Sequence, residues 1–291
     1  MKLATFTHAG RTAIGRVGDD ARVSDLSSVV GDRTLLQVID DWDVLGPAIA
    51  AAGELAVVAE PRLCAPIPVP RNLYAVGKNY RDHVQEFGRS GYDHPDRSTD
   101  IPPVPVVFSK VPTSVTGPFD DIDPHLAITS ELDYEAELAV IIGRGGRGIH
   151  RDQALEHVWG YTIINDVTAR DLQREGQQWT ISKSLDTFAP MGLWAVTADE
   201  VGDPTRLEAS SHVNGKPRQK APVTDLIFDI PQLISNISAG ITLRAGDIIA
   251  TGTPTGVGIG FTPPRFLAPG DVVECAITGL GSLRNTVGNP A

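Results

Sequence analysis

The chain consists largely of short runs in which apolar and polar residues alternate, and glycine or proline separates one run from the next. The clearest alternation covers residues 132–142, where every second residue is apolar. A period of two predicts a β-strand with one buried face. On the other face, the same period places Asp133, Glu135 and Glu137 side by side.

Neighbouring carboxylates on one strand face, spaced ~7 Å apart, repel one another unless water or a shared cation screens them. If the face is buried, the pattern predicts a hard divalent cation, namely Mg²⁺, Mn²⁺ or Ca²⁺. The alternative is an exposed edge strand with an acidic outer face. The segment alone is consistent with both interpretations.

Comparable patterns predict the other elements. We expect strands over residues 73–76, 106–109, 161–165, 246–251 and 272–277, and helices over residues 35–52, 78–86, 152–160, 168–177 and 230–239. Asn214-Gly215 is typical of a two-residue hairpin turn. The 29 glycines and 22 prolines, with few long amphipathic stretches, favour a mainly β or α+β fold.

The patterns divide the chain into two parts. Residues 1–70 are predicted to form a small N-terminal α+β domain that ends in a proline-rich linker. No motif there suggests chemistry, so residues 71–291 are expected to form the catalytic domain. Within it, residues 88–105 contain several prolines and no periodicity, which predicts a loop long enough to be an active-site lid.

Composition excludes several classes of protein. An apolar content of 41% is ordinary for a soluble protein, and no apolar run approaches the ~20 residues that span a bilayer. A formal charge of -11 argues against general nucleic-acid binding. The first residues lack the apolar stretch of a signal peptide, and the two cysteines lie far apart, so we expect reduced thiols and a cytoplasmic location.

Two further positions can carry chemistry. Asp166 ends an apolar β run, so it is either a ligand that joins Glu135 and Glu137 or the cap of the next helix. His83 and Glu86 are three residues apart in a helical pattern, so their side chains can meet. Such a pair is either a surface ion pair or a general base whose histidine is oriented by the carboxylate.

Four residues are candidate anion-binding groups. They are Lys110, Arg170, Gln173 and Lys183, although single surface cations are usually just solvated. Lys183 lies among apolar and small residues, which favours a partly buried ammonium group. The turn-rich segment 251–256 can hold a carboxylate with its hydroxyl and N–H groups, or can be a structural turn only.

Taken together, these segments resemble the fumarylacetoacetate hydrolase family over roughly residues 70–288. The resemblance rests on five segments in the family's order: Tyr74–His83, Leu132–Leu138, Asn165–Gln173, Lys183–Phe188 and Gly246–Val257. It implies a mixed β-sandwich roll, usually dimeric, with a Mg²⁺ or Mn²⁺ ion. The implied ligands are Glu135, Glu137 and Asp166, with Asp133 beside them.

The resemblance also implies roles for other residues. His83 and Glu86 would be the catalytic pair on the lid, and Lys183 would be catalytic as well. Gln173 and Thr253 would hold the substrate, and Arg170 lies where some members use an arginine. The H-x-x-E spacing resembles the bacterial acylpyruvase and 2-hydroxyhepta-2,4-diene-1,7-dioate isomerase branch of the family.

The implied activity is hydrolysis of the C–C bond of a 2,4-diketo acid through a metal-stabilised enolate, giving pyruvate or a substituted pyruvate and a carboxylic acid. The same site can serve an isomerase or an oxaloacetate-type decarboxylase. A non-catalytic metal-binding protein would need the carboxylates but not His83, Glu86, Lys183 and Gln173. The expected partners are a small keto acid and a second copy of the chain, with no nucleic acid and no membrane.

Overall fold

The computed structural model describes residues 1–92, 101–176 and 178–289. Its strands are β1 (Lys2–His8), β2 (Arg11–Val17), β3 (Val23–Asp25), β4 (Arg62–Leu63), β5 (Leu73–Gly77), β6 (Val106–Lys110), β7 (Val115–Thr116), β8 (Leu132–Asp133), β9 (Ala136–Ile142), β10 (Val158–Asn165), β11 (Thr168–Ala169), β12 (Ala189–Thr197), β13 (Glu208–Val213), β14 (Lys216–Pro222), β15 (Ile248–Ala250), β16 (Val272–Ile277) and β17 (Gly281–Thr286).

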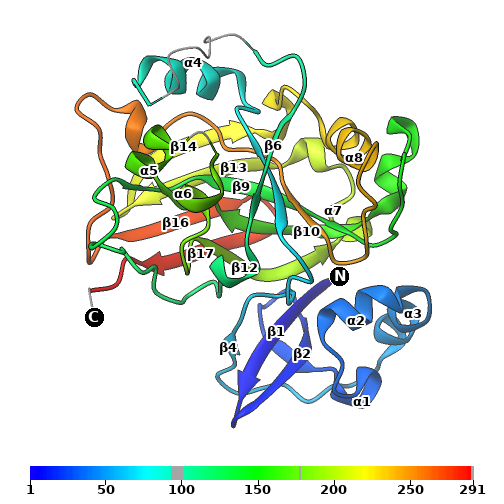
Figure 1. Ribbon diagram of the computed structural model, residues 1–291. Coiled ribbons are helices and arrows are strands. Elements are labelled where there is room, and N and C mark those ends of the chain that lie inside the picture. Colours follow the sequence, from blue (N-terminus) through cyan, green and yellow to red (C-terminus); the bar gives the residue numbers. More distant parts are fainter. Residues whose placement is uncertain (93–100, 177, 290–291) are drawn as a thin grey trace.

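The strands form a large mixed sheet, a smaller antiparallel one, and a separate antiparallel pair of β8 and β11. The large sheet follows the path β3-β2-β1-β12-β10-β9-β15-β5-β6, with β4 beside β1 and β7 beside β12. The smaller sheet has the order β14-β13-β16-β17 and packs against β9 and β10 (Figure 1). A sheet-dominated fold of this kind confirms the predicted fold class.

Short helices surround the sheets. They are α1 (Ser27–Val30), α2 (Leu35–Asp40), α3 (Trp42–Ala51), α4 (Arg81–Arg89), α5 (Arg170–Glu175), α6 (Thr180–Lys183), α7 (Ala198–Val201) and α8 (Ile230–Ser238). Single turns of 3₁₀ helix occur at Pro112–Ser114, Pro204–Arg206, Val223–Asp225 and Gly258–Gly260, and a longer one at Arg151–His157. No helix of the described residues is long and apolar enough to cross a membrane.

Several expected elements differ in detail from the structure. The strand predicted over residues 132–142 is broken after Asp133, because Glu135 and Ala136 donate their N–H groups to side chains of Asn165 and Gln219 and not to a neighbouring strand. The helix predicted over residues 35–52 is two helices. The helix predicted over residues 152–160 is a 3₁₀ helix that ends at His157, and residues 158–160 belong to β10. Neither β12 nor β17 is predicted from the sequence.

The centre of the fold is the antiparallel pair β9–β10. Every residue of both strands is buried, because the small sheet covers one side and further elements of the chain cover the other. Apolar residues on both faces of a strand are typical of a doubly covered sheet. A rigid, buried pair of strands can hold polar side chains at fixed positions, and the predicted ligands lie at one end of this pair.

The N-terminal segment contacts the rest of the chain through the large sheet. Residues Lys2 and Leu3 of β1 pair with Val196 and Ala195 of β12, so the β1–β2 hairpin continues the same sheet. Helices α1, α2 and α3 lie on this side of the molecule, away from α4 (Figure 1). The segment predicted as a loop and lid falls partly on residues 93–100, which lie outside the described residues; residues 101–105 form no regular element.

Candidate metal centre and active site

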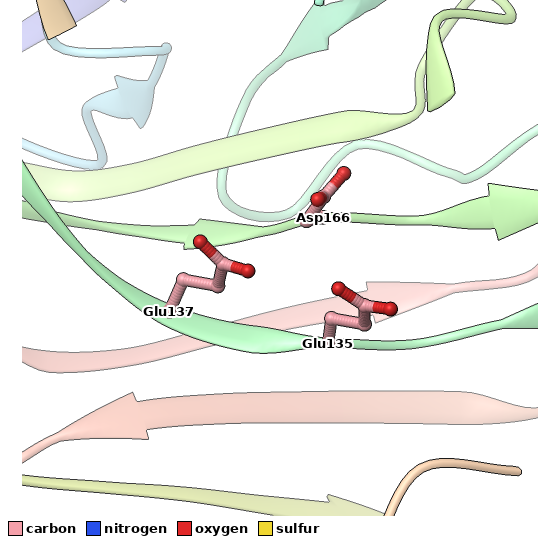
Figure 2. A group of neighbouring side chains, drawn as sticks. All are labelled: Glu135, Glu137 and Asp166. Carbon is pink, nitrogen blue, oxygen red and sulfur yellow. The ribbon is translucent and has the colours of Figure 1, made fainter. Parts of the chain in front are cut away.

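Three carboxylates meet at the end of the β9–β10 pair. Glu137 lies in β9, Glu135 precedes that strand, and Asp166 follows β10. The Asp166 N–H group donates to the Glu135 carbonyl oxygen at 2.8 Å, which ties the two segments together. Ligand oxygens of the three side chains all lie within 4.8 Å of one another, and the carboxylates point into a common space (Figure 2).

Burial decides between the alternatives that the sequence left open. Glu135, Glu137 and Asp166 are at most 5% exposed, so the interpretation as an acidic outer face of an edge strand is wrong. Asp166 is not a helix cap either, since Ala169 occupies the N-cap position of α5. The buried-ligand interpretation remains.

Two lysines contact the Asp166 carboxylate. Lys183 Nζ, at the end of α6, lies 2.9 Å from Asp166 Oδ2 and 2.9 Å from Glu135 Oε2. Lys110 Nζ, at the end of β6, lies 2.6 Å from Asp166 Oδ1 and also donates to the carbonyl oxygens of Val167 and Lys183. Both ammonium groups are buried, so they act as fixed counter-charges and not as solvated surface lysines.

The lysines do not neutralise the whole centre. Glu137 accepts a hydrogen bond from the Gly252 N–H group at 2.9 Å but has no cationic partner within ion-pair distance among the described residues. Burial, followed by the charges of Asp166 and Glu135, raises the pKa of Glu137 well above its usual range. The centre therefore lacks positive charge at Glu137.

Glu135 behaves in the opposite way. Burial alone would raise its pKa, but the nearby charges of Lys183 and Arg170 outweigh burial and lower the pKa to about 2. The carboxylate is consequently ionised at neutral pH. Glu135, Glu137 and Asp166 together offer only oxygen atoms as ligands. Mg²⁺ and Mn²⁺ prefer oxygen ligands of this type.

Arg170 forms a buried network beside the carboxylates. Its Nε lies 2.8 Å from Asp133 Oδ2, one terminal nitrogen lies 2.6 Å from Glu135 Oε1, and the other donates to Gln173 Oε1 at 2.9 Å. Arg170 is only 1% exposed. Its contacts go to Asp133, Glu135 and Gln173, so it fixes the orientation of the Gln173 amide and neutralises part of the acidic cluster.

Helix α4 places His83 and Glu86 over the centre. His83 Nδ1 lies 3.0 Å from Glu86 Oε2, and both side chains are largely buried. His83, Val84 and Phe87 are the buried residues of the helix, because it packs with this face against the roll. The pair is therefore not a surface ion pair but faces the interior.

Thr253 belongs to the loop that follows β15. Its hydroxyl donates to the Ala136 carbonyl oxygen at 3.1 Å and accepts from the Gln219 amide at 2.7 Å. Gln219 was not singled out from the sequence, because its partners in the site, Thr253 and Pro254, lie more than thirty residues away. The loop does hold carboxylates, but they are the protein's own: Gly252 donates to Glu137, and Gly256 donates to Glu86.

A small cavity joins these groups. Its volume is about 10 Å³, and the residues that line it are Val76, Gly77, Lys78, His83, Phe87, Glu135, Glu137, Arg170, Gln173, Trp179, Lys183 and Thr253. All the predicted site residues except Glu86 and Asp166 thus face one space, and those two contact residues that do. The volume holds about one water molecule, which is less than a keto acid occupies.

No pattern in the sequence predicts the aromatic wall of this cavity. Trp179 makes edge contacts with Phe87 and Phe108, at ring distances of 6.4 and 5.4 Å. A β-carbon at Gly77 would lie 2.3 Å from the Trp179 ring, which explains the glycine there. The wall excludes water from the side of the site where Lys183 lies, with its Nζ 5.2 Å from the Phe108 ring.

Comparisons with known proteins agree with this site. Residues 72–288 match the family model described as Fumarylacetoacetate (FAA) hydrolase C-terminal. The chain therefore belongs to the fumarylacetoacetate hydrolase family, whose members are enzymes. Its cofactor is Mg²⁺ or Mn²⁺, and Glu135, Glu137 and Asp166 are the residues that would hold the ion.

The chain is also similar to individual proteins along its whole length. The chain is 43% identical over 312 residues to the oxaloacetate tautomerase YisK of Bacillus subtilis, covering 99% of this chain and 100% of that protein. It is similar to the fumarylacetoacetate hydrolase of the psychrophile Exiguobacterium antarcticum, with 42% identity, a TM-score of 0.86 and 99% of each chain covered. A maleylpyruvate hydrolase of Sphingobium sp. SYK-6, solved with manganese(II) and pyruvate, has 31% identity, a TM-score of 0.81 and complete coverage of both chains.

Proposed function

We propose that this protein is a metal-dependent tautomerase that interconverts the keto and enol forms of a short 2-keto dicarboxylic acid of the oxaloacetate type. The observation that carries the proposal is that His83 and Lys183 line the same small cavity as Glu135 and Glu137. Enolisation needs a base for the carbon-bound proton and positive charge beside the keto oxygen. The full-length similarity to an oxaloacetate tautomerase supports this choice of reaction.

Each residue has a distinct task in the proposed reaction. The bond between His83 Nδ1 and Glu86 leaves Nε2 as the ring nitrogen that accepts a proton from C3 of the keto form. The electron pair of that C–H bond forms the C2=C3 double bond, and the carbonyl π pair moves to the C2 oxygen. That oxygen takes a proton from water while His83 releases the one it accepted, so the net change is a proton shift. The Lys183 ammonium group stabilises the negative charge on that oxygen as it develops.

The cofactor and the remaining residues support this step. A divalent ion held by Glu135, Glu137 and Asp166 supplies further positive charge for the keto acid. Gln173, held by Arg170, presents its amide to the cavity, and the N–H groups of that amide suit the oxygens of a carboxylate. Thr253 also lines the cavity, with its hydroxyl proton donated to the Ala136 carbonyl oxygen. The Trp179 and Phe87 wall excludes water, which strengthens each of these interactions.

A second candidate is hydrolysis of an acylpyruvate. The observation in its favour is the His83–Glu86 pair, because an oriented histidine can take a proton from water as readily as from carbon. Water would attack C4 of a 2,4-diketo acid, and the C3–C4 bond would break to give a pyruvate and a carboxylic acid. The maleylpyruvate hydrolase relative supports this alternative.

One set of assays separates the candidates. The purified protein, loaded with Mn²⁺ or treated with EDTA, is given enol oxaloacetate, and the decay of the enol absorbance is followed. A tautomerase accelerates the decay only with metal and releases neither pyruvate nor CO₂. Pyruvate release from acylpyruvates, with little effect on oxaloacetate, would instead establish the hydrolase. A protein that binds Mn²⁺ and catalyses neither reaction would be a non-catalytic metal-binding protein.

A further inference from the structure

A single glycine links the metal-ligand strand to the catalytic pair. Gly256 donates its N–H group to Glu86 Oε1 at 2.8 Å, and its carbonyl oxygen accepts from the Tyr134 hydroxyl at 2.8 Å. Its φ of +105° is accessible mainly to glycine, and a β-carbon here would lie 2.1 Å from the Arg218 carbonyl oxygen. Gly256 is therefore held in one position between Tyr134 and Glu86.

The neighbouring residue Asp133 holds the rest of this loop. Its carboxylate accepts from the N–H groups of Gly258 at 2.6 Å and Ile259 at 3.2 Å, and it pairs with Arg170. Asp133 is fully buried, so these bonds are protected from water. Asp133 and Tyr134 immediately precede the ligand Glu135, so the loop 256–259 has a fixed place relative to the metal centre.

The loop in turn fits closely around Glu86. A β-carbon at Gly260 would lie 1.9 Å from Glu86 Oε1, so only glycine allows this approach. One Glu86 oxygen is bound by Gly256 and the other lies 3.0 Å from His83 Nδ1. The contacts thus form a continuous chain from Tyr134 through Gly256 and Glu86 to His83.

We propose that Tyr134 is a positioning residue for the His83–Glu86 pair. Its hydroxyl fixes the Gly256 peptide group, which fixes the Glu86 carboxylate, which orients the His83 ring over the cavity. Tyr134 itself does not line the cavity and touches no substrate. The inference rests on the proposed function only in that His83 must take part in the reaction.

The test compares two variants of buried tyrosines that each lose the hydroxyl group. Tyr134→Phe removes the bond to Gly256 and keeps the ring, and Tyr161→Phe is the matched control in β10. We expect Tyr134→Phe to lower kcat by about fivefold, as loss of one buried hydrogen bond does, with KM and Mn²⁺ affinity unchanged. Tyr161→Phe is expected to leave all three unchanged.

A double-mutant cycle distinguishes positioning from a general structural role. Turnover is measured as hydrogen–deuterium exchange at C3 of the keto acid by NMR, which also detects slow variants. In a Glu86→Ala background, where the carboxylate that Gly256 holds is absent, Tyr134→Phe should cause no further loss. A crystal structure of Tyr134→Phe should show Gly256 and Glu86 displaced while Glu135 stays in place.

Three outcomes would overturn the inference. They are a Tyr134→Phe protein with normal kcat, an equal loss of activity with and without Glu86, or Gly256 and Glu86 unmoved in the variant structure. Failure of the proposed function is recognised separately, because His83→Ala would then be as active as the unaltered protein. A silent Tyr134→Phe together with an inactive His83→Ala refutes the positioning role alone.

Discussion

Lys110 offers the most direct test of how the buried centre is held together. Its ammonium group is fully buried and has three partners: the Asp166 carboxylate and the carbonyl oxygens of Val167 and Lys183. Lys110→Met keeps most of the volume of the side chain and removes all three bonds. Burial, with the charge of Lys183, lowers the pKa of Lys110, whereas Asp166 favours the charged form.

The expected loss of stability follows from these contacts. Removing one member of a buried ion pair costs about 3–5 kcal/mol, because the other charge stays behind without its partner. Asp166 keeps its bond to Lys183, which reduces the loss, whereas two carbonyl oxygens lose a buried donor, which adds about 1–3 kcal/mol each before relaxation. We therefore expect Lys110→Met to lower the free energy of unfolding by about 4 kcal/mol.

Urea denaturation followed by circular dichroism measures this quantity. The control is Lys216→Met, which removes an exposed lysine from the β13–β14 hairpin and should change the free energy of unfolding by less than about 0.5 kcal/mol. The midpoint of thermal unfolding should fall by about 10 °C in Lys110→Met. Mn²⁺ affinity should fall as well, because the Asp166 carboxylate loses one of the two lysines that hold it in place.

A small effect would refute this reasoning. If the free energy of unfolding of Lys110→Met were within about 1 kcal/mol of that of the unaltered protein, the Lys110 contacts would stabilise the fold no more than an apolar side chain does. Replacement of some buried ion pairs by apolar residues has this result. Loss of stability with unchanged Mn²⁺ affinity would mean that Lys110 supports the fold and not the centre.

Further predictions concern the ligands and the base. Glu137→Gln should stabilise the metal-free protein at pH 8. Folding raises the pKa of the Glu137 carboxyl, so its contribution to the free energy of unfolding decreases as the pH rises from about 4.5 through the raised pKa. Thermal unfolding in EDTA measures this effect. Mn²⁺ affinity should increase with pH over the same window, because the Glu137 proton must leave, and calorimetry in two buffers would record its release. His83→Ala should lower kcat by about 10²–10⁴ with Mn²⁺ affinity unchanged, as turnover and calorimetry together would show.

Each of these has a contrary outcome. A less stable Glu137→Gln protein in EDTA would show that the Glu137 charge is compensated without metal. If Mn²⁺ affinity were constant between pH 5 and 8, no ligand would lose a proton on binding the ion in this range. An His83→Ala protein that no longer binds Mn²⁺ would make His83 part of the metal site and not the base.

Part of the carboxylate group could be predicted from local order in the sequence. A period of two placed Glu135 and Glu137 on one face, whereas Asp166 joined them through the family resemblance, and their burial could come only from the structure. The break in the strand could not be predicted, because its cause is the side chains of Asn165 and Gln219, which are distant in sequence. The secondary-structure propensities of residues 132–142 contain no information about such long-range contacts.

The same limit applies to the cations and the loop. Lys110 follows a short strand and has no motif of its own, and its partner Asp166 is 56 residues away. The bond between Asp133 and the N–H group of Gly258 spans 125 residues. Arg170 was predicted from the sequence to bind an anion. Its burial beside Asp133 and Glu135 depends on the fold and could not be predicted.

The pairing of β1 with β12 has a consequence for shortened forms of the chain. Without residues 1–70, the backbone of Val196 and Ala195 would lose its partners at Lys2 and Leu3, and one border of the large sheet would become open. Open strand borders recruit strands from other molecules, which leads to aggregation. The amino-terminal hairpin therefore acts as a protective cover for the catalytic roll, and the roll expressed without it should precipitate even though every ligand and base would still be present.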